Sequence, residues 1–164
     1  MRLLLASTLA PLAILLTAAS PPAQPSAPAL AGAEATIRQA VLETNAAMTQ
    51  AANRLDADAF FAYILDTDKG LIVQNGEIFK TRQEALDAVK RGFQGFVKID
   101  RRFDDPCVTV ISPDVALLVA DGTTTATLRD GRTIERRFAV SLLFVLRDGH
   151  WKLLHGHYSM PDRR

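Results

Sequence analysis

Two histidines, His155 and His157, lie two residues apart in the segment W-K-L-L-H-G-H-Y-S near the end of the chain. In a β-strand this spacing places both imidazoles on one face of the sheet. An imidazole acts as a general base when a carboxylate orients it, and pairing of the neighbouring strands puts Asp121 on that same face. His155, His157 and Asp121 are therefore candidate catalytic residues of a lyase or isomerase that needs no cofactor.

The same histidine pair allows two other interpretations. A zinc site takes at least three protein ligands, and no third ligand is evident in this segment, so we predict no bound metal. On the outer face of a sheet the two imidazoles would instead form hydrogen bonds in a flat surface that packs against another subunit.

Three helices are predicted ahead of this segment. Apolar residues recur at helical spacing from residue 34 to residue 54, which indicates an amphipathic helix of about five turns. Asp56 is a good N-cap for a second helix that runs to Leu65. Thr81, followed three residues later by Glu84, has the pattern of a capping box and begins a third helix.

A hairpin and four long strands complete the predicted elements. Asn75-Gly76 is the strongest local signal for a tight hairpin turn. Apolar residues then alternate with period two in the ranges 96–111, 115–128, 133–147 and 151–159. Asp130-Gly131 and Asp148-Gly149 mark the turns between the last three strands, which therefore pair as an antiparallel meander. The fold class is α+β, with the helices on one face of a curved antiparallel sheet.

The lengths of these two turns leave two registers open. Two-residue loops place Val140 between Asp121 and His157, and three-residue loops place Ala139 there. The first register turns both histidines inward beside Phe138 and Leu142. The second turns the other face of the last strand inward, and the residues that it brings together are Leu154, Gly156, Tyr158, Gly122, Thr124 and Arg136.

Composition limits the function classes. The chain has 164 residues, 48% hydrophobic and 23% charged, which suits a single globular domain. Its formal net charge of +1 gives no field that would attract nucleic acid. The single cysteine, Cys107, excludes an internal disulfide and is predicted to be a small buried hydrophobe.

The N-terminus has the pattern of an export signal. Arg2 precedes an apolar run that is too short for a membrane span, so residues 1–23 are predicted to be a cleaved signal peptide. Residues 24–33, rich in Pro and Ala, are predicted to form an extended linker. The domain then covers residues 34–160 and a short tail covers 161–164. We expect an exported protein, periplasmic or secreted, with no stable membrane span after cleavage.

Three segments carry a family resemblance, namely D-A-D-A-F-F, N-G-E-I-F-K-T-R-Q-E-A-L and R-D-G-H-W-K-L-L-H-G-H-Y-S. With the order of elements, they resemble the nuclear transport factor 2-like superfamily, nearest to its SnoaL-like domains and the association domains of calcium/calmodulin-dependent kinases. The resemblance covers about Glu34 to Met160. It implies a cone, in which a strongly bent sheet wraps around the N-terminal helices and leaves a pocket.

The resemblance also implies which residues line this pocket. In the kinase association domains the position that matches Tyr158 faces the pocket and is basic, which favours the second register. Tyr158 and Arg136 are then the polar members of a pocket otherwise lined by apolar side chains such as Phe138 and Leu142. In hydratase-like relatives a tyrosine of the second helix enters the cone, so Tyr63 is either a further pocket residue or plain core.

Isomerases of the superfamily carry a carboxylate base inside the cone, and this sequence has no unambiguous counterpart. The mixed-charge segment around Arg101 and Asp104 is predicted to be a solvated strand edge. We therefore expect the domain to bind a small, mainly apolar molecule and to form a homodimer through its sheet. The alternatives are the cofactor-independent lyase or isomerase and a homo-oligomerisation module with a vestigial pocket.

Overall fold

The first helix is longer than its apolar pattern indicated. The computed structural model describes residues 27–67 and 72–161, and within it α1 runs from Ala27 to Asn53. Residues 27–33, predicted to be an extended linker, are therefore helical, as their alanine content permits. Val41 and Met48 are almost fully buried on the face towards the sheet. The predicted signal peptide lies outside the described residues, and no helix within them is long and apolar enough to cross a membrane.

The second helix is shorter than predicted. Asp56 caps α2 (Ala57–Phe61) by accepting the amide hydrogen of Ala59 at 2.9 Å. Beyond Phe61 the sheet competes with the helix for the backbone, because Leu65 N–H donates to the Leu153 carbonyl at 2.9 Å. The helix therefore ends at Phe61 and not at Leu65.

The hairpin and the third helix follow the predicted chemistry. β1 (Ile72–Gln74) and β2 (Glu77–Phe79) pair around Asn75 and Gly76, whose φ angles of 54° and 79° are those of a type I′ turn. The Thr81 hydroxyl accepts the Glu84 amide hydrogen at 3.1 Å at the start of α3 (Arg82–Phe93). The Glu84 carboxylate also accepts an amide hydrogen at 2.8 Å, from Lys80, which is the residue before the Thr81 cap, so this bond is a variant of the capping box.

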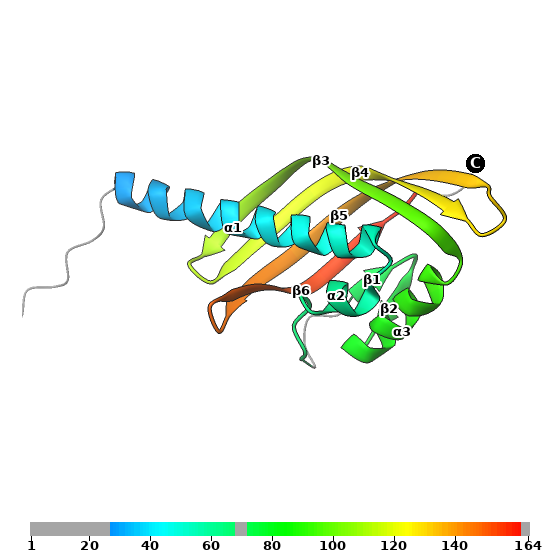
Figure 1. Ribbon diagram of the computed structural model, residues 1–164. Coiled ribbons are helices and arrows are strands. Elements are labelled where there is room, and N and C mark those ends of the chain that lie inside the picture. The colour runs from blue at the N-terminus through cyan, green and yellow to red at the C-terminus, as the bar shows by residue number, and fades with distance from the viewer. Residues whose placement is uncertain (1–26, 68–71, 162–164) are drawn as a thin grey trace, which may run out of the picture.

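The sheet has six strands in the order β2-β1-β6-β5-β4-β3. Its four long strands are β3 (Phe96–Ser112), β4 (Val115–Leu128), β5 (Thr133–Arg147) and β6 (His150–Ser159). All neighbours are antiparallel except β1 and β6. Figure 1 shows α1 lying along one face of the bent sheet, with α2, α3 and the hairpin grouped at one end of it. The predicted α+β cone is confirmed.

The two Asp-Gly turns differ in length, so the sheet contains one three-residue loop and one two-residue loop, and neither predicted register holds throughout. The β4–β5 turn is a three-residue loop and places Asp121 opposite Ala139. The β5–β6 turn has only two residues, but a bulge at Leu154 shifts the pairing beyond it. Trp151 and Leu153 therefore point inward before the bulge, and Gly156 and Tyr158 point inward after it.

A second irregularity changes the expected position of the cysteine. The pairing of β3 with β4 shifts between Asp104 and Cys107, where Asp105 adopts a left-handed φ of 39°. This shift turns Val108 into the core and leaves Cys107 exposed, so the prediction of a buried cysteine was wrong.

Candidate functional site

A cavity of about 640 Å³ lies between the helical layer and the inner face of the sheet. Its walls come from α2, α3, the hairpin and the inward residues of β3 to β6. The side of the cavity formed by Phe60, Phe93 and Phe96 is aromatic, and Ile99, Ala126 and Ile134 add aliphatic surface from the sheet. A volume of this size suits a small organic molecule.

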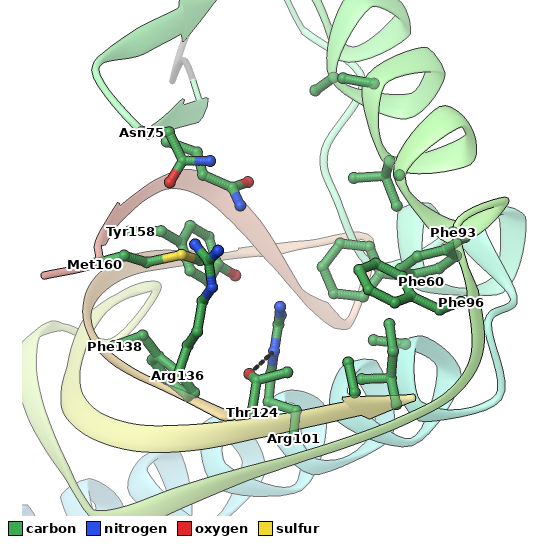
Figure 2. Close-up of a pocket in the computed structure, with 18 of the residues that line it drawn as sticks. Phe60, Asn75, Phe93, Phe96, Arg101, Thr124, Arg136, Phe138, Tyr158 and Met160 are labelled. Atoms are coloured by element: carbon green, nitrogen blue, oxygen red, sulfur yellow. Dashed lines mark hydrogen bonds between the residues drawn. The ribbon is translucent and has the colours of Figure 1, made fainter. Parts of the chain in front are cut away.

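Polar side chains gather on the other side of the cavity. Figure 2 shows Arg101, Thr124, Arg136 and Tyr158 pointing into it across from the three phenylalanines, with Asn75 of the hairpin above them. We call Arg101, Thr124, Arg136 and Tyr158 the polar cluster. The cavity is thus amphipathic, with an apolar end and a cationic end.

Arg101 is held in place by α1. The Asn53 side chain accepts the Arg101 amide hydrogen at 2.8 Å and donates to the Arg101 carbonyl at 3.2 Å. The Arg101 guanidinium lies 5.7 Å from the Phe138 ring centroid and 5.8 Å from that of Tyr158, which is cation–π distance. Its Nε also donates to the Thr124 hydroxyl at 3.4 Å. These contacts with Phe138, Tyr158 and Thr124 fix the orientation of the Arg101 side chain.

Tyr158 is 92% removed from solvent, with 8% of its surface exposed. Burial raises the pKa of its phenol, and the positive charge of Arg101 opposes that rise. A phenol, whose ordinary pKa is 10.0, is protonated at neutral pH, and the rise extends this to higher pH. Tyr158 can therefore donate a hydrogen bond to a ligand at the cationic end.

Three of the five predicted pocket residues line the cavity, namely Tyr158, Arg136 and Phe138. Leu142 does not, because it is fully buried in the core beneath the cavity wall. Tyr63 also lies outside the lining and packs half-buried against the core, with the Lys152 ammonium 5.9 Å from its ring centroid. In the structure Tyr63 is thus part of the packing around the core.

The candidate catalytic residues lie on the opposite face of the sheet. His157 is exposed and His155 half-buried, and neither lines the cavity. Asp121 is also exposed and forms an ion pair with Arg137. On β5, His157 lies opposite Ser141 and Asp121 lies opposite Ala139. His157 and Asp121 are therefore separated by strand β5 and offset by two residues along it. Within the described residues no three His, Cys, Asp or Glu side chains are grouped as metal ligands.

Arg101 is the site residue that sequence reasoning missed. The prediction of a solvated strand edge was wrong for it, because Arg101 pairs directly with Thr124 on the inner face of β4. The alternation of Ile99, Arg101 and Phe103 was the available signal. All three residues share one face of β3, and Ile99 is buried.

Comparisons with known proteins agree with this architecture. Residues 41–163 match the model of the family described as the SnoaL-like domain. No curated protein matches. Among solved structures, a nuclear transport factor 2-like superfamily protein from Salmonella enterica serovar Typhimurium is 18% identical with a TM-score of 0.72, over 79% of this chain and 94% of that one.

Two further solved structures are similar. A candidate dehydratase of the same superfamily from Streptomyces avermitilis is 19% identical with a TM-score of 0.71, over 79% of this chain and 99% of that one. A candidate scytalone dehydratase from Novosphingobium aromaticivorans is 10% identical with a TM-score of 0.70, over 80% and 89% of the two chains. At these identities the likeness shows the fold alone.

Proposed function

The chain belongs to the SnoaL-like domain family within the nuclear transport factor 2-like superfamily, and from that premise we propose that it binds a small, mainly apolar molecule in its cavity. The observation that carries this proposal is the cavity itself, with aromatic walls at one end and oriented polar groups at the other. Ligand sites commonly combine an apolar lining with a few fixed polar groups. A vestigial pocket in a pure oligomerisation module would not need such a polar cluster.

The lining supports binding more strongly than general-base catalysis. Among the residues that the structure describes, the lining contains no histidine, and its single carboxylate belongs to Glu77, an exposed residue of the hairpin. A general base must come within hydrogen-bond reach of the proton that it removes. Two of the similar structures carry dehydratase names, but no residue of this lining is identified as the base that a dehydration would need. Tyr158 is a proton donor in this environment and not a base.

The proposal is tested by filling the cavity. Ala88 lines it from α3, and Ala88→Trp places an indole in the ligand volume. The neutral fluorescent probe N-phenylnaphthylamine should brighten on binding to the wild type and bind at least about tenfold more weakly to this variant, a loss of about 1.4 kcal/mol. Ala46→Trp, on an exposed position of α1, is the matched control and should bind as the wild type does.

Circular dichroism establishes that both variants are folded, and Ala88→Phe replaces Ala88→Trp if the indole prevents folding. A folded Ala88 variant that binds the probe with unchanged affinity would contradict binding in the cavity. Absence of probe binding to the wild type would contradict the proposal as well.

A further inference from the structure

The cationic end of the cavity is a row of three directly paired residues. Arg101 on β3 pairs with Thr124 on β4, which pairs with Arg136 on β5. Neighbouring strands lie about 4.8 Å apart, so the two arginine backbones are roughly 10 Å apart with the short threonine between them. Both guanidiniums rise from the sheet on either side of Thr124 (Figure 2). The space above Thr124 is thus flanked by two cations and floored by a hydroxyl.

These two cations have no acidic partner among residues 27–67 and 72–161. Within the described part of the chain, four arginines line the cavity. Arg132 pairs with Asp130 at 2.7 Å, and Arg137 pairs with Asp121 and, at 3.9 Å, with Asp104.

Arg101 and Arg136 form no ion pair with any carboxylate in the described part of the chain. Placing two cations side by side against apolar walls is unfavourable unless an anion lies between them. Guanidinium groups bind carboxylates through charge-assisted hydrogen bonds, often in bidentate geometry.

We propose that the ligand is an organic acid whose carboxylate lies above Thr124 between Arg101 and Arg136. The Tyr158 hydroxyl donates to the same carboxylate, and the apolar body of the acid extends towards Phe60 and Phe93. This inference rests on the proposed function and names the chemical class of its ligand.

The test compares naphthoic acid with naphthamide, which have nearly the same shape but differ in charge. Both are measured by displacement of N-phenylnaphthylamine from the full domain. The acid should bind at least about tenfold more tightly than the amide, because it gains charge-assisted hydrogen bonds. Arg101→Met and Arg136→Met should each abolish most of this preference and change the affinity for the amide by less than about twofold.

Arg102→Met is the matched control. Arg102 is the next residue of β3, points to the other face and pairs with Asp100 at 2.6 Å, so its loss should leave both affinities unchanged. Thr124→Val provides a further variant if an arginine substitution prevents folding, and it should also reduce the preference for the acid.

Failure of the inference is distinguishable from failure of the proposed function. Equal affinity for acid and amide in the wild type, or displacement by neither while the neutral probe still binds, overturns the carboxylate site and leaves small-molecule binding standing. A wild type that binds neither the neutral probe nor the two naphthyl compounds overturns both. A preference for the acid that survives loss of both arginines also overturns the inference.

Discussion

Substitution of Gly122 by alanine should destabilise the domain far more than a single methyl group usually does. Gly122 lies on the inner face of β4 between Phe103 and Phe138, whose rings meet edge to face at a centroid distance of 5.3 Å. A β-carbon added there would lie 2.1 Å from the Arg102 carbonyl oxygen and 2.6 Å from Cζ of Phe138. The requirement for glycine is steric, because the backbone of Gly122 does not adopt a positive φ.

The size of the effect follows from these distances. Reaching the 3.0 Å that real β-carbon contacts require means that β3 must move by about 0.9 Å relative to β4, since the contacting atom belongs to the backbone. Overpacking of a core costs about 1–3 kcal/mol, and a clash with backbone puts Gly122→Ala at the upper end, near 3 kcal/mol. For a domain of this size the melting temperature should fall by about 6–12 °C.

Urea denaturation monitored by circular dichroism measures this loss. Gly92→Ala is the matched control, because a β-carbon at Gly92 in α3 meets no atom within 4 Å. It should raise the free energy of unfolding by about 0.5–1 kcal/mol, as glycine is a poor helix former. A Gly122→Ala variant within about 0.5 kcal/mol of the wild type would show that β3 and β4 are not as closely packed as described.

Two further predictions concern Tyr158 and the outer face of the sheet. Because burial raises the pKa of Tyr158, the folded state holds the phenolic proton more tightly, so the free energy of unfolding should decline as pH rises above the ordinary value of 10.0. In urea titrations between pH 9 and 11, the free energy of unfolding of Tyr158→Phe should decline less steeply with pH than that of the wild type. Equal slopes for the two proteins would contradict this assignment of the pH dependence to Tyr158. We also propose that the domain dimerises through the outer face, where Val119 is 46% exposed between Cys107 and Ser141. Val119→Arg should then give monomers in sedimentation equilibrium, with Ile78→Arg in the hairpin as a control that stays dimeric. A monomeric wild type, or loss of dimer only with Ile78→Arg, would refute this interface.

The sequence predicted the strands and the order of elements, but not the bounds of α1 and α2 or every residue that the elements position. Side-chain alternation and the two Asp-Gly turns predicted the long strands nearly to the residue, since these are local properties. The bulge at Leu154 carries no turn residue, so the sequence did not predict it. It is nevertheless the feature that turns Tyr158 inward and leaves His157 outside.

Arg101 illustrates a different limit. A charged residue in a strand is usually solvated, and composition alone therefore favours the surface. In the structure Asn53, which is 48 residues earlier on α1, binds both backbone groups of Arg101 and holds this part of β3 against the helix. The alternation with Ile99 and Phe103 indicates the face that Arg101 occupies, whereas the contact with Asn53 joins distant segments and is not visible in any local pattern.

A turn at the surface sets which side chains of β5 face the cavity. The Leu128 N–H donates to the Arg132 carbonyl at 2.8 Å around a three-residue loop, and Gly131 takes the left-handed φ of 86° that such loops require. A two-residue loop would move the pairing by one residue, so that Thr124 would face Arg137 and not Arg136. Every side chain of β5 would then change face relative to β4. Arg137 would then take the place of Arg136 beside Thr124, but the buried side chains of Phe138, Val140 and Leu142 would leave the inner face. The three-residue loop is therefore required by the apolar core that encloses the cavity.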